Sequence, residues 1–407
     1  MRILFVADGR SPIALNWITH FAESGVSGGY EVHLASTYAC QPQLALASLS
    51  FVPVAFSGAA AGYSGPPSKG GGKASWRSAL RQAGTAGLRT ALRQWLGPIT
   101  LPKAARKLEE IVREVEPDMV HAMRIPFEGM LSAQALRNSS LPLLVSVWGN
   151  DFTLHAPATP WMGNLTRRVL RRANALHADC QRDMRLAQTW GFDRHKPAVV
   201  LPGNGGIRMD VFHPPDQANQ VEPGKGRSFQ VINPRGFRAY VRNDVFFHAI
   251  PRVLESEDDV HFICPAMQQE VQAQRWVQEL DLQDCVELLP KVSRAKMAEL
   301  FRGSQIAISP STHDGTPNTL LEAMASGCFP IAGDIESLRE WITSGVNGLL
   351  VDPGDPAALA KAILLALRDP EMRRRAAQSN RELIRQRAEY HHVMRQAEKF
   401  YRQVAGT

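Results

Sequence analysis

Residues 305–331 read QIAISPSTHDGTPNTLLEAMASGCFPI, and this stretch decides the fold of the 407-residue chain. It opens with an alternating apolar run that predicts a short buried strand. Gly315 and Pro317 then predict a tight turn. From Thr319 onward, apolar residues recur at the spacing of one helix face until Gly327. The stretch therefore predicts a strand, a turn and a helix in succession, as in an α/β fold.

Such a unit has the physical properties of a diphosphate site. The first turn of a helix exposes free backbone N–H groups, and the helix dipole favours negative charge there. Asp314 lies just before the predicted helix, and Glu322 lies eight positions later, inside it. Because a carboxylate would repel a neighbouring phosphate, we expect the two acids to hold sugar hydroxyls. The alternative is a buried strand and helix with a solvated Asp314 and a Glu322 on the helix surface.

The motif Asp-Gly-Thr-Pro at 314–317, followed by Glu-Ala-Met-Ala-Ser-Gly at 322–327, resembles a known signature. It is similar to that of retaining family 4 glycosyltransferases (glycosyl transferases group 1), which usually have Glu at both acidic positions. Here Asp314 shortens the first acid by one methylene. The resemblance implies the GT-B fold: two Rossmann-like, doubly wound α/β domains facing a central cleft, with a C-terminal helix crossing back to the first domain.

Composition agrees with a two-domain globular chain. The length suits two domains of ordinary size, with 44% hydrophobic and 21% charged residues and a net charge of +7. Five cysteines without a C-x-x-C pair or metal-ligand spacing predict a reducing, cytoplasmic setting. The chain begins with a strand and not a secretory leader, and its long uncharged segment is broken by prolines. We therefore expect no membrane span.

Charge is unevenly distributed in the first half of the chain. No acid occurs between Glu31 and Glu109, whereas nine Lys and Arg residues fall between 69 and 107. Apolar residues that include Trp76 and Trp95 recur among them at roughly helical spacing. This pattern is typical of a basic amphipathic helix at an anionic membrane surface, which would place the protein peripherally at the inner face of the membrane. A packed helix with a solvated basic face explains the pattern equally well.

Domain boundaries follow from the resemblance and from composition. Residues 198–212 resemble the segment that closes the first domain of the family, and residues 214–228, PPDQANQVEPGKGRS, have the composition of a linker. We expect an acceptor-side domain at 1–213, with 392–407 crossing back to it, and a donor domain at 229–391.

The donor site is expected to hold a nucleotide diphosphate sugar. Arg235 matches the family's diphosphate-binding Arg, and Arg242 or Arg238 stands in for its Lys, since a guanidinium grips phosphate bidentately. Lys291 and Val292 lie where relatives shape the nucleotide-base pocket. Backbone N–H groups of the first βα turn and of the predicted helix start would add to the diphosphate site. The expected donor-binding residues are Gly9, Arg235, Arg238, Arg242, Lys291, Val292, Gly315, Asn318, Thr319, Leu320 and Glu322.

Two residues of the first domain are candidates for acting at the sugar. His121 ends a strand after Pro117-Asp118, matching the first His of the family's P-D-h-h-H-x-H pattern, with Met123 at the second. Asp151 lies in a W-G-N-D turn and could grip an acceptor hydroxyl. A structural His121 and a turn-capping Asp151 are the alternatives. With Asp314, they form the expected catalytic set.

The resemblance implies transfer of a sugar from a UDP- or GDP-linked donor to a hydroxyl of a glycan or lipid-linked acceptor, with retention, in cell-surface polysaccharide or glycolipid synthesis. We expect no cofactor, no nucleic-acid partner and no metal, because no carboxylate cluster has the spacing of a Mg²⁺ or Mn²⁺ site. A phosphorylase would need a pyridoxal lysine motif, which the sequence lacks. A sugar-nucleotide epimerase and a sugar-nucleotide- or lipid-binding protein without transferase activity remain alternatives.

Overall fold

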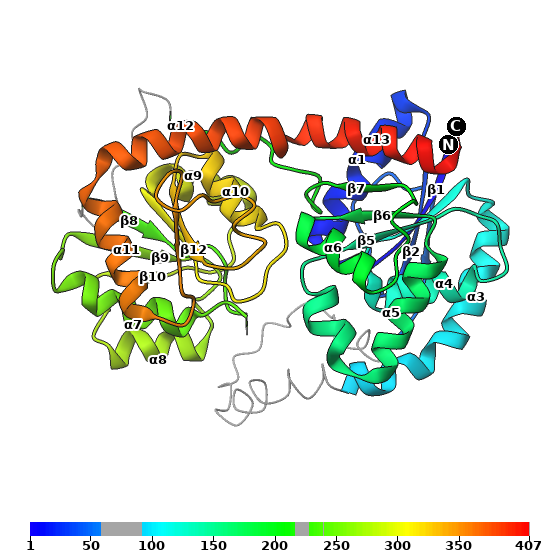
Figure 1. Cartoon of the computed structure of the whole chain (residues 1–407), viewed down its shortest axis with the longest axis horizontal. Coiled ribbons are helices and arrows are strands. Elements are labelled where there is room, and N and C mark those ends of the chain that lie inside the picture. Colours follow the sequence, from blue (N-terminus) through cyan, green and yellow to red (C-terminus); the bar gives the residue numbers. More distant parts are fainter. Residues whose placement is uncertain (58–91, 216–227, 239, 407) are drawn as a thin grey trace, which may run out of the picture. The chain divides into compact units, whose positions relative to one another are not determined.

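The computed structural model of the chain describes residues 1–57, 92–215, 228–238 and 240–406, apart from the side chains of residues 25–28. These residues form two compact units. Unit 1 consists of residues 1–205 and 394–407, and unit 2 of residues 206–393. Each unit is a parallel sheet between layers of helices (Figure 1).

The described part of unit 1 contains a seven-stranded, all-parallel sheet with the order β3-β2-β1-β4-β5-β6-β7. The order reverses between β1 and β4, as in doubly wound folds. Most residues of its strands are apolar, as expected for a sheet covered on both faces. They are β1 (Arg2–Ala7), β2 (Glu31–Ser36), β3 (Ser48–Phe51), β4 (Met119–Ala122), β5 (Leu143–Val147), β6 (Ala175–Ala178) and β7 (Ala198–Val200).

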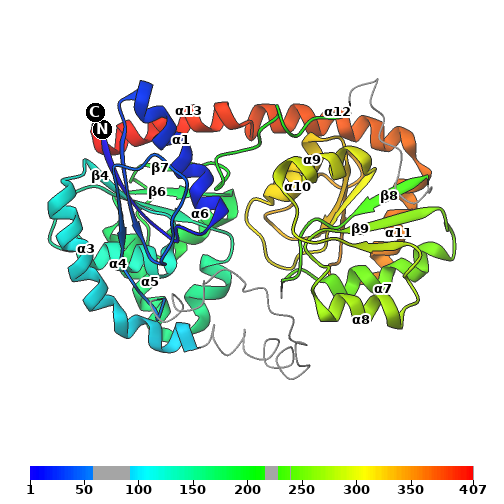
Figure 2. The same ribbon diagram turned by 180° about the vertical axis from the view of Figure 1, so that it is seen from behind.

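Helices cover both faces of this sheet. The core of one face includes residues of α3, α4, α5 and α6, whereas α1 and α13 cover the other face (Figure 2). The helices are α1 (Pro12–Gly28), α3 (Leu101–Val115), α4 (Met130–Ala135), α5 (Pro160–Arg172), α6 (Gln181–Thr189) and α13 (Tyr390–Ala405), with short 3₁₀ or π turns η2 (Gly97–Thr100), η3 (Ile125–Gly129), η4 (Asp151–His155) and η5 (Ala156–Ala158).

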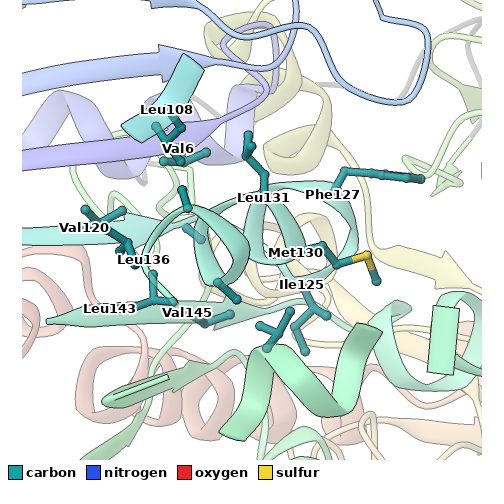
Figure 3. Close-up of a cluster of buried hydrophobic side chains, with 14 of the residues drawn as sticks. Val6, Leu108, Val120, Ile125, Phe127, Met130, Leu131, Leu136, Leu143 and Val145 are labelled. Atoms are coloured by element: carbon teal, nitrogen blue, oxygen red, sulfur yellow. The ribbon is translucent and has the colours of Figure 1, made fainter. Parts of the chain in front are cut away.

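The alternation of side chains along each strand explains how one strand contributes to the cores on both faces of the sheet. Val6 and Val120 point into the core beneath α3 and α4, where they meet Leu108 and Leu131 (Figure 3). Phe5 lies on the opposite face and contacts Tyr401 of α13, with ring centroids 6.3 Å apart. Successive side chains of a strand point to opposite faces, so β1 contributes to both layers.

Unit 2 repeats the plan with a six-stranded parallel sheet among its described residues, in the order β10-β9-β8-β11-β12-β13. The strand and helix predicted within residues 305–331 are β11 and α10, and Gly327 follows α10 with φ +97°. The strands are β8 (Phe229–Ile232), β9 (Val260–Cys264), β10 (Val286–Leu288), β11 (Ile306–Ser309), β12 (Phe329–Gly333) and β13 (Leu349–Val351).

The helices of unit 2 also form two layers. Residues of α7, α8 and α11 share one core, and residues of α9, α10 and α12 share the other. Two of these helices, α11 and α12, are separated at Asp369, whose side chain caps α12. The helices are α7 (Asn243–Leu254), α8 (Val271–Glu279), α9 (Arg294–Gly303), α10 (Asn318–Ala325), α11 (Pro356–Arg368) and α12 (Pro370–Arg387).

The division between the units lies eight residues earlier than the sequence suggested. Residues 206–213 pack with unit 2, because the Ile207 N–H donates to the Ala388 carbonyl at 2.7 Å and Phe212 packs on Phe301. Most of the expected linker, residues 216–227, and much of the basic segment, residues 69–91, lie outside the described residues. Within the described ranges, every helix is too short or too polar to cross a bilayer.

Candidate active site

Three side chains that the sequence singled out meet at the start of α10 in unit 2. Arg235 donates from Nη1 to Thr319 Oγ1 at 3.0 Å and from Nη2 to Asp314 Oδ2 at 2.6 Å. The ion pair is well buried, with 7% of the Arg235 side chain and 13% of the Asp314 side chain exposed. The loop after β8 and the turn before α10, distant in sequence, thus form one charged cluster.

The loop that carries Arg235 is fixed by buried amides. Asn233 follows β8 directly and donates from Nδ2 to Asn243 Oδ1 at 3.0 Å. Asn243 in turn donates to the Gly236 carbonyl at 3.0 Å. Gly236 has φ +63°, a conformation that glycine adopts without steric cost. Arg235 is therefore held between two fixed points at the carboxyl end of the sheet.

The turn before α10 is fixed in a similar way. Asp314 Oδ1 accepts from the Gly315 N–H at 3.1 Å, and Ser337 Oγ donates to the Asp314 carbonyl at 2.8 Å. Ser337 is fully buried. Asp314 is thus oriented by its own turn and by Arg235, and is not a freely solvated carboxylate.

The expected backbone donors are partly engaged. The Leu320 N–H donates to the Pro317 carbonyl at 2.8 Å, and the Gly9 N–H of unit 1 donates to Ser36 Oγ at 3.1 Å. No side chain caps α10. Arg235 Nε and Asn318 Oδ1 are buried and have no hydrogen-bond partner among the described residues. The unsatisfied guanidinium N–H is a donor that an incoming phosphate oxygen can use.

Glu322 lies on the second turn of α10 and is partly buried. Burial raises the pKa of its carboxyl to about 7, although the charges of Arg294 and Arg235 oppose this shift. The carboxyl is thus half protonated near neutral pH, and it can accept a hydrogen bond from, or donate one to, a sugar hydroxyl. Arg294, in the first turn of α9, is a cation of this site that the sequence analysis did not identify.

The other expected donor residues differ in how they are placed. Arg242 grips Asp244 with two guanidinium nitrogens at 2.7–3.1 Å, so its charge is already paired. Arg238 is exposed and donates to the Tyr240 hydroxyl at 2.9 Å. Lys291 is exposed and Val292 is partly buried, both just before the Ser293 cap of α9.

His121 of unit 1 is a core residue. It is fully buried, with Nδ1 hydrogen-bonded to the Tyr401 hydroxyl and Nε2 to Ser146 Oγ at 2.8 Å. The chain of contacts continues to His177 at 2.8 Å and, on the other side, to Trp17, which donates to Tyr401 at 2.8 Å. Burial, and then the neighbouring His177, lowers the pKa of His121 well below its usual value. Because both ring nitrogens are occupied inside the core, these contacts favour the structural alternative for His121 over a role at the sugar.

Asp151 is likewise fully engaged in unit 1. Its buried carboxylate accepts from Arg124 Nη2 at 2.7 Å and from the N–H groups of Ile125 and Trp148 at 3.1 and 3.3 Å. It therefore ties two loops together, the turn-capping alternative stated above. The loops themselves line a cavity of about 240 Å³ whose walls include Arg93, Arg124 and Trp148. Trp148 opens the W-G-N-D turn and Arg93 belongs to the basic segment between 69 and 107, whereas Arg124 belongs to no motif that the sequence analysis used.

A group of three potential metal ligands lies elsewhere in unit 1. The ligand atoms of Asp179, Cys180 and Asp183 lie within 4.8 Å of one another. However, Arg182 donates to Asp183 Oδ1 at 2.9 and 2.7 Å, and burial raises the pKa of both Asp183 and Cys180. Arg182 already pairs with Asp183, and burial disfavours the Cys180 thiolate that a metal would need, so this group is better explained as a buried ion-paired cluster.

Comparison with known families covers both units. Residues 17–203 match the family described as Glycosyl transferase 4-like domain, and residues 218–383 match Glycosyl transferases group 1. The chain belongs to the group 1, family 4 glycosyltransferases. The family resemblance noted in residues 314–327 is thereby confirmed.

Individual relatives of this family 4 chain match it in part. A D-inositol 3-phosphate glycosyltransferase of Geodermatophilus obscurus is 28% identical over 218 residues, which are 50% of this chain and 48% of that protein. A phosphatidyl-myo-inositol mannosyltransferase of Mycobacterium leprae is 31% identical over 225 residues, 54% of this chain and 58% of the relative. The chain thus spans about half the length of the curated relatives it matches.

Solved structures show the fold of the family 4 chain. Sucrose-phosphate synthase from Thermosynechococcus elongatus superposes with a TM-score of 0.73 at 16% identity and covers 99% of both chains. Anabaena HepE in complex with UDP and glucose gives a TM-score of 0.71 at 15% identity over 99% of this chain and 100% of that one. These likenesses confirm the predicted GT-B fold.

Proposed function

We propose that the chain transfers a sugar from a nucleoside diphosphate sugar to a hydroxyl group, with retention at the anomeric carbon and without a metal ion. The observation that carries the proposal is the buried contact of Arg235 with Asp314 and Thr319 at the start of α10. Family membership and the UDP bound by structural neighbours such as HepE support a nucleotide sugar as the donor.

The bonds that break and form in the transfer determine which charges the site must stabilise. The bond from the anomeric carbon to the β-phosphate oxygen breaks, the acceptor oxygen bonds to that carbon, and the hydroxyl proton passes to a departing phosphate oxygen. The developing negative charge of the diphosphate must be stabilised. Arg235 would supply its unpaired Nε–H and its charge, and the α10 dipole would add to this effect.

The two acids would hold the neutral parts of the donor. Glu322 would bind the ribose hydroxyls and Asp314 the transferred sugar. The raised pKa of Glu322 supports this role, because a half-protonated carboxyl close to a phosphate repels it less than a carboxylate does. Arg235 and Arg294 are cations near this carboxyl, and they support the proposal that side chains stabilise the departing diphosphate.

The test is incubation of the purified chain with a panel of radiolabelled UDP- and GDP-sugars, with and without EDTA. We expect slow hydrolysis of one donor in the absence of acceptor, unchanged by EDTA, and release of the sugar with retained configuration. No release from any donor that binds would favour a sugar-nucleotide-binding protein, and conversion of the sugar on its nucleotide would favour an epimerase. Loss of activity in EDTA would overturn the metal-independent part.

We also propose that unit 1 associates peripherally with an anionic membrane during synthesis of a cell-surface polysaccharide or glycolipid. Trp95 and Ile99 are each 60% exposed, and Trp161 is 45% exposed. Trp161 lines a groove of about 630 Å³, together with Arg168 and Arg171. Exposed aromatic and aliphatic side chains beside arginines match the interface between lipid headgroups and acyl chains.

Sedimentation with liposomes tests this association. Wild-type protein should pellet with vesicles that contain phosphatidylglycerol and remain in the supernatant with neutral phosphatidylcholine vesicles. The double variant Trp95→Gln/Ile99→Gln should lose most of the binding, whereas Val346→Gln, which changes an equally exposed apolar residue of unit 2, should keep it. Equal recovery of the wild type in both supernatants would reject the membrane proposal.

A further inference from the structure

The cavity of about 240 Å³ in unit 1 lies where α/β folds bind ligands. Its walls come from loops that follow four neighbouring strands: Asp8 after β1, Tyr38 after β2, Arg124 after β4 and Trp148 after β5. These are the carboxyl ends of the strands, on both sides of the point where the sheet order reverses. The volume suits a group no larger than about one sugar unit.

The residues that line this cavity carry unsatisfied donors. Arg93 Nε, Arg124 Nε and Trp148 Nε1 are buried and have no hydrogen-bond partner within the described ranges. No lining residue has a buried side-chain acceptor in the same state. A buried donor without an acceptor costs about 1–3 kcal/mol, so three of them point to a ligand that brings acceptor oxygens.

The arginines around the cavity differ in whether they form ion pairs. Arg10 pairs with Asp8 through two contacts of 3.0 Å, and Arg124 pairs with Asp151 at 2.7 Å. Arg93 forms no ion pair within the described residues, and its Nη1 donates to the Tyr38 hydroxyl. One guanidinium thus remains uncompensated by an ion pair.

Two further titratable groups, Glu128 and His155, lie at the cavity wall. Glu128 is 2% exposed and accepts from Thr37 at 2.7 Å, and burial raises its pKa. Burial and the charges of Arg124 and Arg93 lower the pKa of His155 to about 4, partly opposed by Asp151, so this ring is neutral at pH 7. The cavity wall thus presents unsatisfied N–H donors beside an arginine, Arg93, that forms no ion pair in the described part of the chain.

Aromatic rings complete the wall. The Arg93 guanidinium lies 4.6 Å from the ring centroid of Phe127, and that of Arg124 lies 5.8 Å from the Trp148 ring. Phe127 has φ +68°, a conformation that is costly for a side chain of its size and that the surrounding loop must enforce. The ring beneath Arg93 is thus held in place, and with it the orientation of the unpaired cation.

We propose that this cavity binds an oxyanion carried by the acceptor, so that the acceptor is an anionic saccharide with a carboxylate or a phosphate monoester. Arg93 supplies the charge, and the N–H groups of Arg93, Arg124 and Trp148 supply the hydrogen bonds. The assignment of the ligand as an acceptor rests on the proposed function, whereas the preference for an oxyanion rests on the cavity alone.

Isothermal titration of the full chain with D-glucose, D-glucuronate and D-glucose 6-phosphate tests the preference and separates the two oxyanions. We expect at least one anionic sugar to bind ten times more tightly than glucose. Arg93→Gln should remove this preference, and Trp148→Phe, which keeps the ring but lacks the N–H, should weaken the anionic sugar about threefold. Arg402→Gln, an exposed arginine of α13, is the matched control and should behave as wild type.

Two results would overturn the proposal: equal affinities for glucose and both anionic sugars, or a preference that survives in Arg93→Gln and Trp148→Phe. UDP and GDP titrated in parallel report on the donor site independently. Retained nucleotide binding without an anionic preference rejects this inference and leaves the proposed function intact. An anionic preference with neither nucleotide binding nor donor hydrolysis supports an oxyanion site and rejects the transferase.

Discussion

Unit 1 and unit 2 have the same doubly wound architecture, yet they differ in what happens to the charged residues at their strand ends. In unit 2, Arg235 and Asp314 converge on the start of α10 and keep an unsatisfied guanidinium donor. In unit 1, the side chains of His121 and Asp151 are hydrogen-bonded to other residues of the same unit. The buried donors without a partner belong to Arg93 and Arg124 instead. The comparison teaches that a residue's place in a sequence motif does not decide its role. A buried hydrogen-bond donor without a partner is more direct evidence that the residue binds a ligand.

The largest effect should come from the unit 2 cluster. Arg235→Gln leaves a shorter, neutral polar side chain and removes the charge that would stabilise the departing diphosphate, so donor hydrolysis should fall by about 100-fold or more. Steady-state release of labelled sugar measures it. Arg275→Gln, an exposed arginine of α8, should keep wild-type rates. Near-normal turnover in Arg235→Gln would contradict the assignment of the catalytic cation to unit 2.

The His121 network of unit 1 should respond in the opposite way. His121→Phe removes the imidazole that bridges Tyr401 and Ser146 and leaves Ser146 with His177 alone, so the free energy of unfolding of unit 1 should fall by about 1–3 kcal/mol. Turnover per folded molecule should stay within about twofold of wild type. Denaturant unfolding followed by tryptophan fluorescence, with exposed His195→Phe as control, checks both statements. A loss of turnover without a loss of stability would restore His121 to the chemistry.

The stability of unit 2 should depend on pH through Glu322. Its pKa is raised in the folded chain to about 7, so the folded state holds this proton more tightly than the unfolded state does. The stabilisation is complete below about pH 4.5 and is lost as the pH rises through 7. Relative to Glu322→Gln, the ligand-free wild type should lose about 1–3 kcal/mol between pH 5 and 8. An unchanged difference between the two proteins at both pH values would mean that the carboxyl ionises normally.

The smallest effects concern the second cation of unit 2. Arg242 is already paired with Asp244, so Arg242→Gln should raise the KM for the donor by only about 3–10-fold. Arg238→Gln should change KM less than twofold, because that side chain is exposed. Michaelis kinetics on the preferred donor rank them. A larger increase in KM for Arg238→Gln than for Arg242→Gln would mean that Arg238, and not Arg242, is the second residue that binds the diphosphate.

Much of the fold could be predicted because its signals are local. The apolar run from Arg2 to Ala7 and the turn and helix around Gly315 follow from periodicity and from turn residues, and the structure places β1 and α10 there. The start of α12 also carries a local signal, since Asp369 before Pro370 is typical of a helix start. The expected boundary at 213 was late because Ile207 bonds to Ala388, a contact that composition does not reveal.

The sites were harder to predict because they depend on distant contacts. His121 is buried by Tyr401, which lies 280 residues later, and no pattern around the histidine signals this. Arg235 could be named only through the family resemblance, since Asp314 lies 79 residues away. Arg124 carries one local signal, a charged residue just after a buried strand, which the sequence analysis did not use.

The central claim is that Arg235 and the start of α10 hold a diphosphate. Titration of the wild type and Arg235→Gln with UDP and uridine, and with GDP and guanosine, isolates the contribution of the phosphates. Wild type should prefer one diphosphate over its nucleoside, and Arg235→Gln should reduce that preference at least tenfold while its nucleoside affinity stays the same. An equal preference in both proteins would contradict the account.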